Sequence, residues 1–212
     1  GIAHEINNPL GNILGYAKML TKDSDITAGQ REKLEDIAEQ AKRGGDIIRG
    51  LFDFSSQSKP LFREVSINEV ILKTVKLMSG HIGKLKIKIK TNLSNVPMVN
   101  ADPKQIEQVI NNLLLNAIHA LEGRQKGTIT VETEYKYNHV EVRVADNGHG
   151  IPNEILPRIF DPFFTTKPVG KGVGLGLSIS SGIIRDHNGS IHVESEEDRG
   201  AEFSFQIPAM SA

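Results

Sequence analysis

The chain has 212 residues, which is enough for one large or two small domains with a buried core. Its formal net charge of −1 gives no strong field toward nucleic acid or a membrane surface. The absence of cysteine excludes disulfides and thiolate metal sites and fits a reducing compartment, and no apolar run approaches the roughly 20 residues of a membrane-spanning helix.

Two amphipathic helices are expected at the start of the chain. Apolar residues between Ile6 and Leu20 recur at alternating steps of three and four, and the same spacing returns between Leu34 and Leu51. A polar turn around residues 23–25 would join them as a hairpin. Because one hairpin leaves apolar surface uncovered, we expect two copies to pair as a four-helix bundle.

His4 opens the first of these helices, beside Glu5 and one turn before Asn8. It stands two positions before Ile6, so its side chain is expected about 200° away from the apolar face, in solvent. A neutral imidazole nitrogen can attack a phosphoryl group, and Glu5 is a neighbour that could take the proton from the other ring nitrogen. Taken alone, His4 would be interpreted as a solvated surface histidine. Only three residues precede it, so we expect this helix end to fray or to pack abnormally.

The polar stretch from Ser55 to Pro60 is interpreted as a linker between domains at residues 1–58 and 62–212. Beyond it, helices and alternating strands favour an α/β sandwich, in which a helix layer covers a mixed, mostly antiparallel sheet. Asp102 is expected to cap a long helix, with Pro103 at its first position. The expected helices are 65–78, 102–123 and 175–186, and the expected strands are 85–90, 128–137, 139–145, 191–195 and 201–207.

Two segments of the second domain carry side chains that suit a nucleotide. Asn112 and Asn116 share one helix face, where amide oxygens suit Mg²⁺ or a phosphate-bound metal. Asp146 ends a strand and can accept a hydrogen bond from an exocyclic amine such as that of adenine, while Gly148 and Gly150 allow close backbone approach. Alone, each has an ordinary explanation, as surface or capping asparagines and as a tight turn.

Two further segments follow. Phe160–Phe164 places three aromatic residues in a loop, which is either a plug over the core or a lid that docks when nucleotide binds. Glycines between Gly170 and Gly176 precede a helix and can turn bare N–H groups toward an anion. Lys167 or Lys171 could then reach a phosphate. The glycine spacing is not that of a P-loop.

The order and spacing of the four segments closely resemble the catalytic ATP-binding domain of sensor histidine kinases, within the wider group of DNA gyrase, Hsp90 and MutL ATPases. His4–Pro9 resembles the phosphoacceptor box of the same kinases. The resemblance therefore implies a Bergerat fold that binds ATP and Mg²⁺. The matching boxes are the N box at Asn112 and Asn116, the first glycine box at Asp146–Gly150, the phenylalanine box at Phe160–Phe164 and the second glycine box at Gly172–Gly176.

The resemblance also implies individual roles. His4 would accept phosphate, Glu5 would act as general base, and Asn8 would orient a water that dephosphorylates a partner aspartate. Asn116 is the implied metal ligand, and His119 stands where many relatives carry a lysine near the γ-phosphate. The implied nucleotide contacts are Asn112, Asn116, His119, Asp146, Gly148, Gly150, Ile151, Phe160, Lys167, Lys171, Gly172, Gly174, Leu175 and Gly176.

The leading hypothesis is the cytoplasmic kinase core of a two-component sensor, which phosphorylates His4 from ATP, donates to a response-regulator receiver domain and can reverse that step as a phosphatase. One alternative is a non-catalytic ATP-sensing interaction module. Another is a gyrase- or Hsp90-like ATPase, which would need a glutamate one turn before Asn116. Asn112 occupies that position, and Glu107 lies nearly on the opposite side of the helix.

The chain is expected to be a fragment whose parent protein is soluble or membrane-anchored. It should form a homodimer through the hairpin, without nucleic acid and without direct membrane contact. The remaining histidines show no metal-ligand spacing and are interpreted as surface or turn residues; they are His81, His139, His149, His187 and His192.

Overall fold

The computed structural model describes residues 2–55, 60–82, 87–124, 126–167 and 173–210, with positions 2–5, 46, 49–55 and 79–82 described by their backbone alone. The chain divides into two compact units. The first comprises Gly1–Ser58 and Pro162–Gly176, and the second comprises Lys59–Asp161 and Leu177–Ala212. Within the described part of the chain, no helix combines the length and apolar character needed to cross a membrane.

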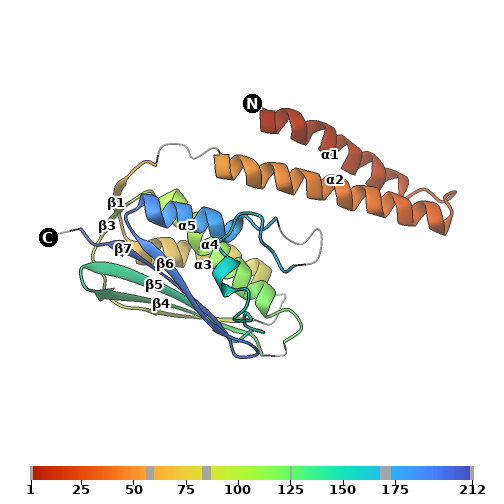
Figure 1. Cartoon of the computed structure of the whole chain (residues 1–212). Coiled ribbons are helices and arrows are strands. Elements are labelled where there is room, and N and C mark those ends of the chain that lie inside the picture. Colours follow the sequence, from red (N-terminus) through yellow and green to blue (C-terminus); the bar gives the residue numbers. More distant parts are fainter. Residues whose placement is uncertain (1, 56–59, 83–86, 125, 168–172, 211–212) are drawn as a thin grey trace. The chain divides into compact units, whose positions relative to one another are not determined.

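The first unit contains the predicted helical hairpin, formed by α1 (Ile2–Leu20) and α2 (Ala28–Ser55) (Figure 1). A capping box starts α2: the Thr27 N–H donates to Gln30 Oε1 at 2.8 Å, and the Gln30 N–H donates to Thr27 Oγ1 at 3.2 Å. The backbone of α1 is helical from Ile2, so it does not show the fraying expected at His4, and the side chains of residues 2–5 lie outside the described residues.

The apolar faces of the hairpin are only partly covered within one chain. Ala17 and Ala41 are buried between the helices, as the heptad spacing predicts. Four larger apolar residues on the same spacing remain substantially exposed, with exposed fractions of 36% to 46%; they are Ile6, Ile13, Leu20 and Ile37. A second hairpin could cover these side chains, as the prediction of a four-helix bundle requires.

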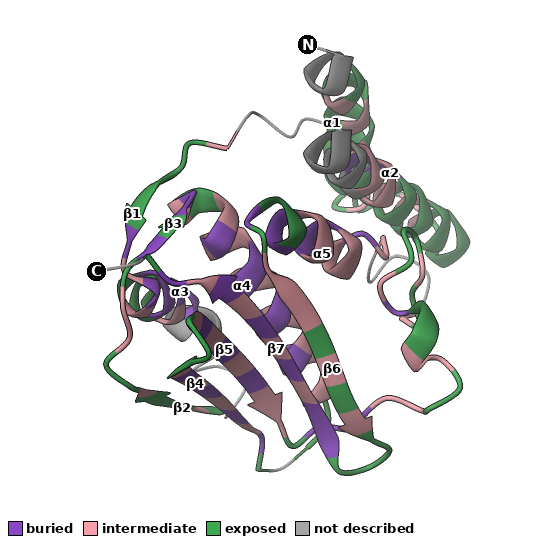
Figure 2. Cartoon of the chain, turned by 60° about the vertical axis from the view of Figure 1, so that its left-hand side comes forward, coloured by how far each residue is buried: buried purple, intermediate pink, exposed green. Residues whose placement is uncertain are grey.

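The second unit is a five-stranded sheet with its helices on one face (Figure 2). The strand order is β2-β4-β5-β7-β6, and only the β2–β4 pair is parallel. This confirms the predicted mixed, mostly antiparallel sheet. The strands are β2 (Lys88–Leu93), β4 (Thr128–Lys136), β5 (His139–Asp146), β6 (Ser190–Glu196) and β7 (Gly200–Pro208), and the helices are α3 (Ile67–Ile82), α4 (Pro103–Ala120) and α5 (Gly176–Asp186).

The short strand expected before residue 65 is present as β1, whereas one further strand and the bounds of some elements differ from the sequence-based expectations. β1 (Arg63–Val65) pairs antiparallel with β3 (Val99–Ala101), and the sequence did not predict β3. With three residues, β3 is too short to show the alternation by which a strand is recognised. The strand expected at 85–90 is found at Lys88–Leu93.

The core lies between the sheet and α4. Alternate residues of β4, β5 and β7 point toward the helices, and α4 buries its apolar face against them (Figure 2). Ile106, Ile110 and Leu113 are completely buried on that face. This packing fixes the rotation of α4 and leaves Asn112 and Asn116 half-buried beside the core.

Asp102 caps α4 as predicted. Its Oδ1 accepts hydrogen bonds from the backbone N–H groups of Lys104 at 2.9 Å and Gln105 at 3.3 Å, and Pro103 is the first helical residue. The helix ends at Ala120, and Gly123 follows with a φ of 82°. The cap and the core contacts together set where the asparagines of α4 lie along the sheet.

Candidate functional site

The helix α4 supplies the polar residues on one side of the site. Asn112, Asn116 and His119 are all half-buried on it. Asn112 Nδ2 donates to the Ser180 hydroxyl of α5 at 3.3 Å, and the Ser180 side chain is fully buried. Asn112 therefore ties α4 to α5, a structural task that the sequence did not reveal. Its side-chain oxygen is the atom that would serve a nucleotide or metal.

Asp146 is the last residue of β5 and is half-buried. Its Oδ1 accepts a hydrogen bond from the Gly148 N–H at 2.8 Å. Burial raises the pKa of the Asp146 carboxyl above its usual value, and hydrogen bonds from the Gly148 and Ala201 backbone only partly oppose this shift. The result is an oriented, partly desolvated acceptor, which suits recognition of an amine on a nucleotide base.

The loop after Asp146 lies against the C-terminal end of α4. A Cβ on Gly148 would fall 2.5 Å from the Ala120 carbonyl oxygen, so only glycine fits there without a shift of backbone. The His149 N–H donates to the same carbonyl at 3.2 Å. Because Ala120 is one turn after Asn116, the loop brings Asp146 and the Asn116 helix to the same end of the unit.

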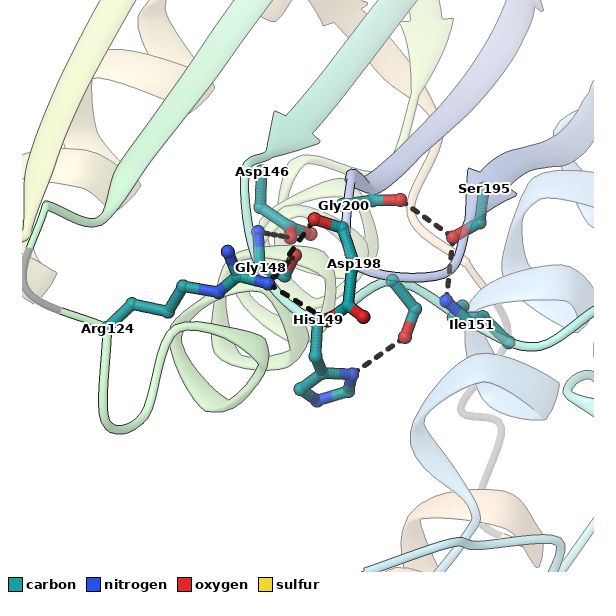
Figure 3. Close-up of polar contacts among 9 residues, drawn as sticks. Arg124, Asp146, Gly148, His149, Ile151, Ser195, Asp198 and Gly200 are labelled. Atoms are coloured by element: carbon teal, nitrogen blue, oxygen red, sulfur yellow. Dashed lines mark hydrogen bonds and ion pairs between the residues drawn. The ribbon is translucent and has the colours of Figure 1, made fainter.

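The turn between β6 and β7 holds this loop from its other side (Figure 3). Gly150 has a φ of 69°, and a Cβ there would lie 2.1 Å from the Glu196 carbonyl oxygen. The Asp198 N–H donates to the His149 carbonyl at 2.7 Å. The Ser195 hydroxyl accepts from the Ile151 N–H at 2.8 Å and donates to the Gly200 carbonyl at 2.8 Å. The first glycine box is thus clamped along its whole length.

Arg124 adds a charged contact to the same clamp (Figure 3). Its Nη2 donates to the Gly148 carbonyl at 3.1 Å and to the Asp198 carbonyl at 3.4 Å. Sequence analysis missed Arg124, Ser195 and Gly200 as residues of the site. No motif marks them, because they contact backbone atoms that only the fold brings close.

Phe163 and Phe164 of the phenylalanine box and the described part of the second glycine box lie in the segment Pro162–Gly176, which belongs to the first unit. Phe163 has a φ of 66° and is 55% exposed. A Cβ on Gly174, whose φ is 73°, would lie 2.5 Å from the Phe164 carbonyl oxygen. Leu175 is buried, and Gly176 is the first residue of α5. The ends of the loop between these boxes are therefore in backbone contact.

The predicted residues other than Asn112, Asn116 and His119 of α4 and Gly176 of α5 fall into three groups. Asp146, Gly148, Gly150 and Ile151 lie together in the loop beside the end of α4, and the half-buried Phe160 belongs to the same unit. Lys167, Gly174 and Leu175 lie in the Pro162–Gly176 segment, and Asn8 is exposed on α1. Lys171 and Gly172, and the side chains of His4 and Glu5, lie outside the described residues.

Replacing Ser195 with alanine is expected to loosen the first glycine box. The Ile151 N–H would lose its acceptor, at a cost of about 1–3 kcal/mol in the free energy of unfolding, and nucleotide affinity should fall several-fold. Ser195→Thr keeps the hydroxyl and should restore most of both. Chemical denaturation and nucleotide titration measure the two effects, with Ser204→Ala on the open face of β7 as control. Equal effects of Ser195→Ala and Ser204→Ala would contradict the clamp.

Comparison with known proteins gives two family matches. Residues 101–211 match the family described as histidine kinase-, DNA gyrase B- and HSP90-like ATPase. Residues 1–60 match the His kinase A (phospho-acceptor) domain. The two matches follow each other along the chain and together include each of the boxes described above.

Individual relatives agree with these matches. The chain is 37% identical over 213 residues to the sensor histidine kinase ZraS of Salmonella typhi, with 100% of this chain and 45% of ZraS covered. It is similar to full-length ShkA in complex with AMPPNP, with a TM-score of 0.76, 27% identity, and coverage of 100% of this chain and 45% of that one. It is also similar to ThkA in complex with the response regulator protein TrrA, with a TM-score of 0.72, 34% identity, and coverage of 99% and 60%. The chain spans about half the length of the curated relatives it matches.

Proposed function

This chain belongs to the sensor histidine kinases of two-component systems, and we propose that it phosphorylates His4 from ATP and passes the phosphoryl group to a response-regulator aspartate. The main support for the proposal is that one chain contains both parts that the reaction needs. The clamped Asp146 loop lies beside the end of α4 that carries the asparagines, and the helical hairpin matches the phosphoacceptor domain. Residues 1–58 would serve as the dimerisation and phosphoacceptor domain and residues 62–212 as the catalytic domain. The exposed apolar side chains of the hairpin support pairing with a second copy.

Asp146 is proposed to accept a hydrogen bond from the exocyclic amine of adenine, because its carboxylate is oriented by Gly148 and partly withdrawn from water. Gly148 and Gly150 would let the base or ribose approach the backbone. His119, in the last turn of α4, is proposed to lie near the phosphates. The remaining proposed nucleotide contacts are Asn112, Ile151, Phe160, Lys167, Lys171, Gly172, Gly174, Leu175 and Gly176.

The residues present fit a Mg²⁺ ion that arrives with the nucleotide. Among the described residues there is no group of three or more histidine, cysteine or acidic side chains that could hold a metal by itself. Mg²⁺ in such sites takes few protein ligands because phosphate oxygens and waters supply the rest. Asn116 would contribute its amide oxygen, and the bound ion would offset the negative charge of the phosphates.

The proposed chemistry is a direct transfer to an imidazole. A ring nitrogen of His4 attacks the γ-phosphorus of ATP, the bond from that phosphorus to the β–γ bridging oxygen breaks, and ADP leaves. Glu5 would take the proton that the other ring nitrogen gives up. The product phosphohistidine then donates to the aspartate of a receiver domain, and Asn8 would orient the water that removes phosphate from that aspartate.

An ATPase of the gyrase or Hsp90 kind is disfavoured by the residues of α4. Asn112 stands where such enzymes need a water-activating glutamate. Glu107 does not replace it, because it lies nearly on the opposite side of α4, where its carboxylate pairs with Lys73 of α3 at 2.7 Å. We therefore favour transfer to His4 over hydrolysis.

The test is incubation with γ-labelled ATP, followed by acid and alkali treatment of the protein. Phosphohistidine is expected, so the label should be acid-labile and alkali-stable, and it should pass to a receiver domain from a panel. Steady phosphate release without labelled protein would point to an ATPase. ATP binding with neither label nor hydrolysis would point to the non-catalytic sensing module.

Glu5 and Asn8 are expected to affect two different reactions, the phosphorylation of His4 and the dephosphorylation of the receiver aspartate. Glu5→Ala should slow labelling of His4 without loss of ATP affinity, because the general base does not contact the nucleotide. Asn8→Ala should leave labelling intact and impair dephosphorylation of the receiver. The rates of labelling and of receiver dephosphorylation separate the two, with Asn12→Ala, also exposed on α1, as control. Unchanged phosphatase activity in Asn8→Ala would refute its role.

ATP affinity is expected to fall as the pH drops through the raised pKa of Asp146. The carboxylate form accepts the hydrogen bond from the adenine amine, so ATP affinity should be highest above that pKa. Because the pKa is raised, the affinity should begin to fall at a higher pH than it would for an ordinary aspartate. Asp146→Asn removes the charge and should weaken binding about 10- to 150-fold, the equivalent of about 1.5–3 kcal/mol. Titration with a fluorescent ATP analogue over a pH series measures this, and Asp186→Asn, exposed at the end of α5, is the control. A pH dependence that persists in Asp146→Asn would contradict the assignment.

A further inference from the structure

His187, at the C-terminal end of α5, is buried and has both ring nitrogens engaged. It is 2% exposed, so its interpretation as a surface or turn residue is wrong with respect to burial. Its Nδ1 lies 2.7 Å from the Ile183 carbonyl oxygen, and its Nε2 lies 3.0 Å from the Asp102 backbone nitrogen. A carbonyl can only accept and an N–H can only donate, so Nδ1 carries the proton and Nε2 is the acceptor. The neutral ring thereby joins the end of α5 to the start of α4.

Asp102 extends this junction to the segment that enters the second unit. Its Oδ2 accepts a hydrogen bond from the Leu61 N–H at 2.8 Å, while its Oδ1 caps α4. Burial alone would raise the pKa of Asp102, but the backbone hydrogen bonds from Leu61, Lys104 and Gln105 bring it below its usual value. The carboxylate therefore stays ionised and can hold both partners at once.

Phe62 contacts the other side of the junction. Its ring centroid lies 4.9 Å from that of His187, with a tilt of 56° between the rings, which is a favourable arrangement for an aromatic pair. Phe62 remains 43% exposed and Leu61 remains 79% exposed. The incoming segment is therefore held by one hydrogen bond and one ring contact just before β1, with little burial of its side chains.

We propose that Phe62, Asp102 and His187 form a linker anchor, which couples the segment entering the catalytic domain to the two helices of its nucleotide site. From Asp102 the coupling runs along α4 to Asn112 and Asn116, and from His187 it runs along α5 to Gly176. The inference rests on the proposed function: movement of the linker would alter how the bound ATP is presented to His4. Phe62 and His187 are thus positioning residues, which contact neither ATP nor the phosphoacceptor.

The proposal is tested by measuring ATP affinity and the rate of His4 labelling separately in the full chain. Phe62→Ala removes the ring contact but keeps both partners of the Asp102–His187 hydrogen bond. It should slow labelling about 2- to 12-fold, in line with the energy of an aromatic pair, with ATP affinity unchanged within about twofold. Phe62→Tyr keeps the ring and should label at the parent rate, as should Leu72→Ala, an exposed change on α3.

His187→Gln keeps an acceptor for the Asp102 N–H but removes the partner ring. It should slow labelling as Phe62→Ala does, and the double variant should be no slower than the slower single variant, because both lose the same contact. The anchor would be overturned if Phe62→Ala labelled His4 at the parent rate, or if its ATP affinity fell in parallel with its labelling rate. It would also be overturned if the two substitutions slowed labelling additively in the double variant.

A second measurement separates failure of the anchor from failure of the proposed function. Hydrogen exchange at the Leu61 and Asp102 amides should accelerate in Phe62→Ala, since both N–H groups donate within the anchor. This result does not depend on kinase activity. Unchanged exchange at both amides overturns the anchor, whereas a parent chain that takes up no phosphate on His4 overturns the proposed function instead.

Discussion

Replacing His4 with glutamine is expected to remove all acid-labile phosphate that the protein takes up from γ-labelled ATP. Glutamine is of similar length and polarity but has no ring nitrogen with a nucleophilic lone pair. The proposed nucleotide contacts of the catalytic domain are untouched, so ATP affinity should stay at the parent value. The expected pattern is therefore complete loss of labelling with full nucleotide binding, measured on the same preparation.

The control for this experiment is His192→Gln. His192 is exposed on β6 and hydrogen-bonds only locally, with Nε2 3.0 Å from the Ser190 hydroxyl. It should label at the parent rate. Label that survives in His4→Gln would mean that another residue accepts the phosphate and would refute the proposed acceptor. A fall in ATP affinity in His4→Gln would show that the substitution acts through more than loss of the nucleophile.

The parts of this molecule that follow from local pattern were predicted well. Heptad spacing identified both hairpin helices, and the Asp102-Pro103 pair identified the start of α4, because caps and periodicity depend on neighbours in sequence. The loop after Asp146 was singled out from residue types and order, and its role in nucleotide binding stays a prediction. These predictions needed no knowledge of which segments meet in space.

The contacts that hold the site could not be predicted in the same way. Ser195 and Arg124 act on backbone groups of the Asp146 loop, and those partners are 44 and 24 residues distant. Such hydrogen bonds impose no residue pattern, because any segment of loop offers N–H and carbonyl groups. They become visible only when the register of β6 and β7 is known.

The burial of His187 could have been predicted only in part from the sequence. It follows Ile179 and Ile183 at spacings of four, on the buried face of α5, so helical periodicity could have predicted its burial. The turn residues Asn188 and Gly189 directly after it favoured an exposed position instead. The structure contains both features, since His187 is buried directly after the last residue of α5 and the chain then reverses at Asn188, whose φ is 55°.

Replacing Gly200 with alanine is expected to dismantle the nucleotide loop. Gly200 has a φ of 99°, and a Cβ there would lie 1.9 Å from the Asp146 carbonyl oxygen and 3.0 Å from the Asn147 Cα. Both obstacles are backbone atoms, so no side-chain rotation can relieve the clash. The conformation costs about 1–2 kcal/mol and the overpacking about 1–3 kcal/mol more, and any shift that relieves it displaces Asp146.

The comparison that isolates this effect is Gly123→Ala. Gly123 also has a positive φ, of 82°, but among the described residues no heavy atom other than those of its chain neighbours would lie within 4 Å of an added Cβ. Gly123→Ala should therefore lose only the stability that a positive φ costs a non-glycine residue, and it should bind ATP like the parent. Gly200→Ala should lose more stability in denaturant titrations and most of its ATP affinity. If the two variants were equally stable and bound ATP equally well, the close approach of β7 to the Asp146 backbone would not be what positions the nucleotide loop.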